Sequence, residues 1–138
     1  MVYEPACAES LCDFVKEHKR VRVIGAGTKL GSAAGVDAAT VSCAKLSGIT
    51  EYDPQEYTLS AQCGTPLQTI AEALAEHGQY LPFDPPFAED GATIGGTIAC
   101  GLSGPGSIHH GVVRDFVIGI RFVDGRGVVT QGGGKVVK

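Results

Sequence analysis

The chain has 138 residues, of which 43% are hydrophobic, and its formal net charge is −4. This length fits one domain with a core of its own, and the negative charge argues against binding to nucleic acid. We expect no transmembrane helix, because no apolar run is long enough, and no signal peptide, because Glu4 comes early and no apolar h-region follows.

The cysteine pattern favours a reducing compartment. The five cysteines are an odd number and form no Cys-x-x-Cys pair, so their spacing fits neither a disulfide framework nor a zinc site. We expect reduced, mostly buried thiols in a cytoplasmic protein.

The first elements along the chain are a helix and a strand. Ser10 is a candidate N-cap for a helix with an apolar face, and Pro5 marks an alternative, earlier start. Residues 21–24 alternate as a strand and run into the glycine-rich segment 25–31. A strand followed by such a turn is the usual geometry of a phosphate-binding loop. A tight turn without a ligand is the alternative.

Two familiar nucleotide-binding motifs do not fit. The Rossmann pattern requires glycine three positions after Gly27, where Leu30 stands, and no acidic residue follows at the required distance. The Walker A pattern fails because Val136 follows Gly134-Lys135 and the upstream glycine is missing.

Three short strands and a helix are predicted next. The strands cover residues 40–43, 48–52 and 57–63, with a turn at Asp53-Pro54. A capping box of Thr65 and Gln68 predicts the helix start. Pro66 would take the first helical position and Gly78 would end the helix, with a buried stripe of Leu67, Ile70, Ala71 and Leu74.

The segment 85–106 is dense in glycine and small residues. Such residues allow a positive φ or a close approach to another group, and backbone N–H groups can then face an anion. Ile94, Ile98 and Leu102 recur every four positions, which predicts a short helix anchored on the core. A glycine-rich surface loop without a ligand is the alternative.

The last predicted unit is a hairpin. Residues 116–123 form its first strand, Asp124-Gly125 its turn and residues 127–130 its second strand. Because the strand–turn unit is left open after Gly132–Lys135, we expect the natural protein to continue.

Few side chains have the spacing of a catalytic group. Thr28 and Lys29 would present a hydroxyl and a cation to a phosphate, although Lys29 could equally be a solvated surface lysine. Arg114-Asp115 is expected to be an ion pair that closes the hairpin, with direct contact to a ligand as the alternative. Cys100 is expected to line a cofactor and not to act as a nucleophile. The adjacent His109-His110 pair cannot face one metal ion from a regular element, so we expect no metal site there.

Several of these stretches occur in an order typical of one family. Together they resemble the vanillyl-alcohol-oxidase-type (PCMH-type) FAD-binding domain, and the likeness is strongest to the FAD-binding subunits of bacterial glycolate oxidases. The resemblance runs from about residue 20 to the end. The stretches that carry it are Val-Ile-Gly-Ala-Gly-Thr-Lys at 23–29, Gly-Thr-Pro-Leu at 64–67, Leu-Pro-Phe-Asp-Pro-Pro at 81–86, Ala-Thr-Ile-Gly-Gly at 92–96 and Val-Arg-Asp-Phe-Val-Ile-Gly at 113–119.

The resemblance implies a site made of two loops that cradle the FAD pyrophosphate. The segment 25–29 would form the first loop and segment 92–104 the second, with Pro86 near the adenosine end. The implied cofactor-binding residues are Gly25, Ala26, Gly27, Thr28, Lys29, Pro86, Ala92, Thr93, Ile94, Gly95, Gly96, Ala99, Cys100, Gly101 and Gly104. Both loops are expected to offer backbone donors to the diphosphate.

The resemblance also implies an α+β fold, with two small α/β subdomains and the flavin between them. Residues 1–138 would be the N-terminal portion of the FAD-binding domain, without the substrate or cap domain, so the catalytic residues are not identified. Because Lys29 and not histidine follows Thr28, we expect non-covalent FAD.

The implied activity is flavin-dependent oxidation of a small 2-hydroxy acid such as glycolate. The implied partners are other subunits of a hydroxy-acid oxidase complex, an iron–sulfur subunit among them, which would hold a cytoplasmic protein at the periphery of the inner membrane. The alternative is a non-catalytic module that binds FAD or another nucleotide and serves subunit assembly.

Overall fold

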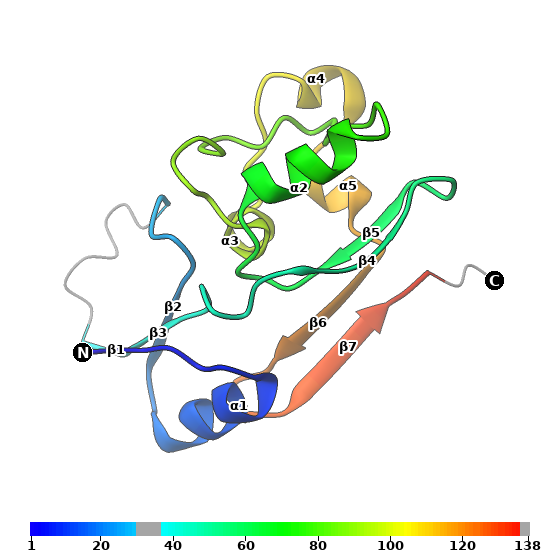
Figure 1. Ribbon diagram of the computed structural model, residues 1–138. Helices are drawn as coiled ribbons and strands as arrows, with labels where there is room; N and C mark the ends of the chain where they lie inside the picture. Colours follow the sequence, from blue (N-terminus) through cyan, green and yellow to red (C-terminus); the bar gives the residue numbers. More distant parts are fainter. Residues whose placement is uncertain (30–36, 136–138) are drawn as a thin grey trace.

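A three-stranded parallel sheet forms the N-terminal part of the fold (Figure 1). The computed structural model describes residues 1–29 and 37–135, so Leu30 and Gly31 of the predicted first loop lie outside the described residues. The strands lie in the order β1 (Val2–Tyr3), β3 (Ala39–Ser42), β2 (Val21–Ile24). Helix α1 (Ala8–Glu17) connects β1 to β2. The central strand β3 contributes Val41, which is fully buried.

Two antiparallel hairpins follow. Strands β4 (Ile49–Asp53) and β5 (Thr58–Ala61) form the first, and β6 (Gly119–Val123) and β7 (Val129–Gly133) form the second. The second hairpin packs on α1 through its loop, where a Cβ on Gly127 would lie 2.6 Å from the carbonyl oxygen of Cys12. The hairpin predicted near the C-terminal end and the mixed α+β class are confirmed.

Four helices form the other end of the molecule (Figure 1). They are α2 (Leu67–Ala75), α3 (Ile94–Cys100), α4 (Ser107–His110) and α5 (Val113–Phe116). Leu67, Ile70 and Leu74 of α2 are buried, as their spacing predicted, whereas Ala71 is exposed. Burial of each large apolar side chain contributes about 1.5–3 kcal/mol. None of the described helices is both long and apolar enough to cross a membrane.

Neither predicted N-cap residue caps its helix, although the alternative of an earlier start for the first helix is confirmed. Helix α1 begins earlier than Ser10, with Cys7 as its N-cap, and the Ser10 hydroxyl donates to the Cys7 carbonyl oxygen at 2.9 Å. Helix α2 has no capping box, because the Thr65 hydroxyl lies 2.7 Å from the Gln62 carbonyl oxygen and 3.1 Å from that of Gly48. The Thr65 hydroxyl, which the sequence pattern assigned to the cap of α2, is therefore used in contacts with Gly48 and Gln62 instead.

The strand predicted over residues 116–123 begins only at Gly119. Residues 113–116 form the turn α5 instead, and its start is fixed by the Asp115 carboxylate, which accepts the Val112 N–H at 2.9 Å. The hairpin loop is also longer than the predicted Asp124-Gly125 turn. It runs to Val128, and Gly127 in this loop has a φ of 71°.

The thiols are less buried than expected. All five cysteines are free, but only Cys12 and Cys43 are buried, while Cys7, Cys63 and Cys100 are exposed. The expected apolar anchor of α3 is also incomplete. Ile94 and Ile98 are half-buried, Leu102 is 40% exposed, and the buried residue of the helix is Thr97. The Thr97 hydroxyl donates to the Thr93 carbonyl oxygen at 3.0 Å, so its burial leaves no unpaired hydroxyl donor.

Candidate functional site

The first loop and the central glycine-rich segment lie against each other. Gly25 comes directly after β2, and a Cβ on Gly25 would overlap the side chain of Thr93. Thr93 is 5% exposed and is the N-cap of α3, where its hydroxyl oxygen accepts the Gly96 N–H at 3.3 Å. Only glycine at position 25 allows the end of β2 to reach the start of α3. The structure thus joins two segments that are almost seventy residues apart in the sequence.

Lys29 lies beside Phe87 and near Cys100, the last residue of α3. Its Nζ atom lies 5.7 Å from the centre of the Phe87 ring, within the range of a cation–π interaction. Burial lowers the pKa of Lys29, and the nearby Cys100 raises it by a smaller amount. Lys29 is therefore a half-buried cation within the candidate site and not a solvated surface lysine.

The first loop offers backbone donors that no protein acceptor uses. Among the described residues, no acceptor lies within hydrogen-bonding distance of the N–H groups of residues 25–29. Gly27 has a φ of 79°, a conformation that can turn successive N–H groups toward one concave side of the loop. With the Lys29 ammonium beside it, this loop has the donor chemistry of an anion site.

The central segment does not offer the donors that the sequence suggested. The Ile94 N–H donates to the Thr65 carbonyl oxygen at 2.9 Å, and the Gly95 N–H donates to that of Cys63, also at 2.9 Å. Thr93 forms a short antiparallel bridge with Pro66, which lays this segment along residues 63–67. The N–H groups of Ile94 and Gly95 are therefore used within the chain in this structure, whereas the sequence suggested that this segment would offer its donors to a diphosphate. In this segment the unpaired donors among the described residues include Thr93, Leu102 and Ser103.

The glycines of the central segment instead permit close packing of the chain on itself. A Cβ on Gly95 would lie 2.5 Å from the Cβ of Cys63, and one on Gly104 would overlap Asp84. Gly96 differs, because a Cβ there would meet only the Thr93 hydroxyl oxygen, at 3.2 Å. Gly101 has a φ of 63° and ends α3. Of the other predicted residues, Ala92 is buried, Pro86 is half-buried, and Ala99 and Cys100 are exposed.

Phe87 is a site residue that the sequence analysis missed. Its φ is 65°, which is rare for a bulky side chain, and its carbonyl oxygen accepts the Ala92 N–H at 3.0 Å. The loop thus holds Phe87 46% exposed beside Lys29. The preceding Pro85-Pro86 pair was the available signal, since it marks a constrained turn.

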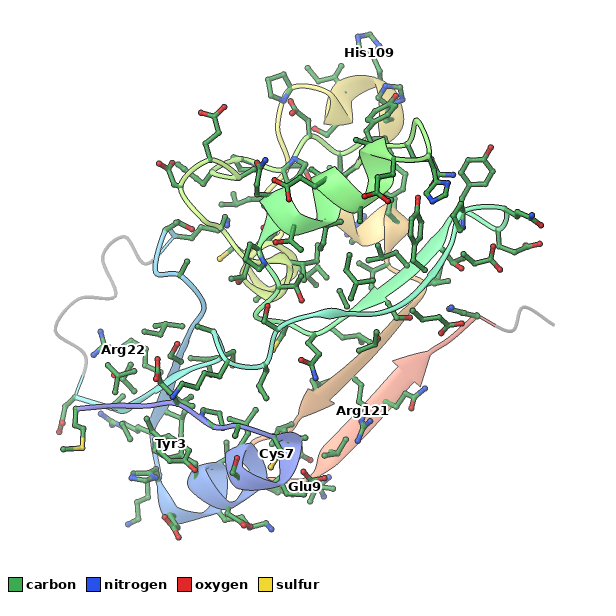
Figure 2. All side chains as sticks on the ribbon, viewed as in Figure 1. Tyr3, Cys7, Glu9, Arg22, His109 and Arg121 are labelled. Atoms are coloured by element: carbon green, nitrogen blue, oxygen red, sulfur yellow. The ribbon has the colours of Figure 1, made fainter. Side chains whose placement is uncertain are left out.

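The other polar candidates lie outside this contact. His109 projects from α4 at the edge of the molecule (Figure 2), and both it and His110 are exposed. No cluster of side chains suited to a metal ion occurs in residues 1–29 and 37–135. Arg114 and Asp115 are 3.8 Å apart and exposed, and they belong to α5, so the predicted closure of the hairpin by this pair is wrong.

One hollow on the described surface lies away from this contact. It has a volume of about 490 Å³ and is lined by residues of β1, α1 and β3, with Phe14 and Lys45 among them. It contains none of the predicted site residues.

Comparison with known proteins connects this geometry to a family. The sequence profile of a family described as FAD binding domain matches residues 1–133. The chain is 38% identical to the glycolate oxidase subunit GlcE of Escherichia coli over 136 residues, which is 99% of this chain and 39% of that protein. It is 32% identical to the D-2-hydroxyglutarate dehydrogenase of Xanthomonas citri over 86% of this chain and 26% of that protein.

Solved structures share the fold at lower sequence identity. An alkyldihydroxyacetonephosphate synthase superposes with a TM-score of 0.79 at 20% identity, over 99% of this chain and 27% of that one. The wild-type Phl p 4.0202, a glucose dehydrogenase, superposes with a TM-score of 0.77 at 19% identity, over 95% and 28%. The chain thus spans well under half the length of each of these proteins.

Proposed function

The chain belongs to the FAD binding domain family, and on this premise we propose that residues 1–138 form the FAD-binding portion of an oxidoreductase acting on a 2-hydroxy acid such as glycolate. The observation that carries the proposal is the first loop. Its unpaired N–H groups and the Lys29 ammonium lie together beside α3. A diphosphate needs several donors and a compensating positive charge, and this loop has both.

The proposed cofactor-binding residues act in two ways. Those of the first loop would donate to the diphosphate, and Lys29 would offset its charge. Those of the central segment would hold that loop in place through close contacts such as Gly25 with Thr93. The proposed set is Gly25, Ala26, Gly27, Thr28, Lys29, Pro86, Ala92, Thr93, Ile94, Gly95, Gly96, Ala99, Cys100, Gly101 and Gly104, to which the structure adds Phe87.

The residues of this chain would bind and orient the cofactor. FAD would supply the redox chemistry by accepting a hydride from the α-carbon of the substrate. We propose that the cofactor is held non-covalently, because the loop 25–31 contains no histidine to which a flavin could be attached.

The choice of a 2-hydroxy acid rests on the relatives. These include glycolate oxidase subunits, D-lactate dehydrogenases and a D-2-hydroxyglutarate dehydrogenase. Two of them are named as subunits, which supports a complex with other subunits. We further propose that an iron–sulfur subunit among these partners takes the electrons. We propose a cytoplasmic location, at the periphery of the inner membrane through those partners.

Anaerobic titration of the full natural protein tests this function. A visible flavin spectrum that bleaches on addition of glycolate, D-lactate or D-2-hydroxyglutarate would support it, and the most effective acid would identify the substrate. Acid precipitation then tests the attachment, since non-covalent FAD passes into the supernatant. Flavin that remains in the pellet would contradict the non-covalent assignment.

A second outcome would favour the non-catalytic module. Lys29 and Cys100 are titratable side chains near the contact of the two loops, and they do not form an acid–base pair. A complex that binds FAD but is not reduced by any of the three acids would indicate a module that serves subunit assembly.

A further inference from the structure

Two cysteines come together beneath the contact of the two loops. Cys43 follows β3 and Cys63 follows β5. The segments that carry them are joined by backbone hydrogen bonds, from the Leu46 N–H to the Cys43 carbonyl oxygen at 2.9 Å and from the Gly64 N–H to the Leu46 carbonyl oxygen at 2.7 Å. A Cβ on Gly64 would overlap the carbonyl oxygen of Cys43. Glycine at this position therefore lets the two chains touch.

The two thiols affect each other in opposite ways. Their mutual interaction is the largest cause that raises the pKa of Cys43 and lowers that of Cys63 to about 7. The N–H groups of Cys63 and Gly64 lower the pKa of Cys63 further, against the opposing effect of burial. Cys43 is only 7% exposed, whereas Cys63 is exposed to solvent. An exposed thiol with a lowered pKa thus lies close to a buried thiol.

We propose that Cys63 is an oxidation site and that Cys43 is its resolving thiol, so that a hydroperoxide converts the pair to a Cys43–Cys63 disulfide. An accessible thiolate next to a second thiol is the arrangement that favours reversible oxidation. The other three cysteines occupy different positions, since Cys7 and Cys12 belong to the start of α1 and Cys100 ends α3. The site is independent of the proposed FAD chemistry.

The reaction balances with one hydrogen peroxide. The Cys63 thiolate attacks one peroxide oxygen, an S–O bond forms, the O–O bond breaks, and the departing hydroxide takes a proton to become water. The Cys43 sulfur then attacks the sulfur of the resulting sulfenic acid, the S–S bond forms and the S–O bond breaks. The hydroxide and the Cys43 proton leave as a second water. Two thiols lose two electrons and the peroxide becomes two waters.

The disulfide would form at a residue that supports the candidate site. The Cys63 carbonyl oxygen accepts the Gly95 N–H at 2.9 Å, and a Cβ on Gly95 would meet the Cys63 side chain. Oxidation would therefore join the residue after β3 covalently to the turn after β5, whose Cys63 carbonyl oxygen accepts a hydrogen bond from α3.

Peptide mass spectrometry of the full chain tests the proposal. The reduced protein is treated with hydrogen peroxide at neutral pH, its remaining thiols are alkylated, and it is digested with trypsin and Glu-C. The digest places Cys43 in residues 30–45, Cys63 in 57–72 and Cys100 in 90–114, so each pairing gives a distinct product. We expect the 30–45 peptide joined to the 57–72 peptide, and its separation by dithiothreitol.

Two variants and one control assign the roles. Cys43→Ser should abolish the cross-link and leave a Cys63 sulfenic acid that dimedone traps, whereas Cys63→Ser should leave Cys43 unmodified because it is buried. Cys7→Ser removes another exposed cysteine and should leave the cross-link unchanged. The proposal is wrong if peroxide oxidises Cys63 in the wild type without the cross-link, or if Cys63 pairs with Cys100 instead.

Discussion

The side chain of Thr93 occupies the space that a Cβ on Gly25 would need. This contact holds the end of β2 against the start of α3, and it places the unpaired donors of the first loop beside the central glycine-rich segment. Gly25 does not have a positive φ, so its requirement for glycine comes from space and not from backbone conformation.

Gly25→Ala should therefore destabilise the protein by roughly 1–3 kcal/mol, the usual cost of overpacking. Thr93→Ala alone should cost about 1 kcal/mol through loss of the helix cap. In the double variant the added methyl group finds space, because the nearest remaining atom is the Thr93 Cβ at 3.4 Å. We expect a double-variant cost clearly below the sum of the two single costs, measured by urea unfolding. Additive costs would show that the contact does not constrain position 25.

Gly95 and Gly96 form a matched pair of test positions in α3. Alanine should be favoured over glycine by about 1 kcal/mol in a helix. At Gly95 the new methyl group would meet Cys63, with its Cβ at 2.5 Å and its carbonyl oxygen at 2.7 Å, so Gly95→Ala should be destabilising by roughly 1–3 kcal/mol. Gly96→Ala should leave the free energy of unfolding nearly unchanged or slightly higher.

FAD titration of the folded Gly96→Ala variant then reports on the cofactor site alone. Weaker binding without loss of stability would indicate that FAD approaches Gly96 closely. If Gly95→Ala were as stable as Gly96→Ala, the packing of α3 on Cys63 would be looser than described.

Lys29→Ala should weaken FAD binding by about 1–3 kcal/mol, the range for hydrogen bonds to charged groups. The loss should shrink as salt rises, because part of the interaction is screened. Lys16→Ala is the control, since Lys16 is an exposed lysine of α1 that pairs with Asp13. Calorimetric titration at two salt concentrations measures both variants. Equal affinities for Lys29→Ala and the wild type at low salt would remove this lysine from the site.

The same lysine predicts a pH dependence of FAD binding. Burial lowers the pKa of Lys29 below its ordinary value of 10.5. The positive charge is present below that pKa and is lost as pH rises through it, so affinity should begin to fall at a lower alkaline pH than for an ordinary lysine. Lys29→Ala should lack this decrease. A decrease of the same size in the variant would assign it to another group.

Asp124 should stabilise the hairpin loop in a pH-dependent way. Its carboxylate accepts the N–H groups of Arg126 and Val128 and pairs with the Arg126 guanidinium at 2.7 Å, which lowers its pKa below the ordinary value of 3.8. A lowered folded-state pKa contributes stability above the unfolded-state pKa, and this is lost as pH falls through the folded-state value. Asp124→Asn should therefore lower the Tm at pH 7, and the difference should vanish in acid. A Tm difference that does not change with pH would show that the asparagine side chain disturbs the loop by its shape and not by its lost charge. Asp13→Asn serves as the control.

Alkylation of Cys63 should be half-maximal near pH 7, because the thiolate is the reactive form and the pKa of this residue is lowered to about 7. Cys43→Ala removes the largest cause of that shift, so its midpoint should move upward toward the value of an ordinary thiol, about 8.5. Iodoacetamide labelling followed by peptide mass spectrometry measures both profiles. Identical midpoints would show that Cys43 does not lower the pKa of Cys63.

Patterns that depend on neighbouring residues were predicted well from the sequence. The strand at residues 21–24, the stripe of Leu67, Ile70 and Leu74, and the hairpin around Asp124 all appear in the structure. Each rests on periodicity or turn chemistry within a few positions of the chain. The ordered glycine-rich motifs also identified the family, because the combination is specific where each motif alone is not.

Features that depend on distant residues were not predicted. Thr65 bonds to Gly48, seventeen positions away, and so does not cap α2. The N–H groups of Ile94 and Gly95 are used by residues 63–65, which a count of glycines cannot reveal. Sequence patterns indicated most of the elements and the family, but not strand β1 or the short helices α4 and α5. The tertiary structure was needed to show which backbone donors remain unpaired and which cysteines meet, because both depend on contacts between segments that sequence spacing does not encode.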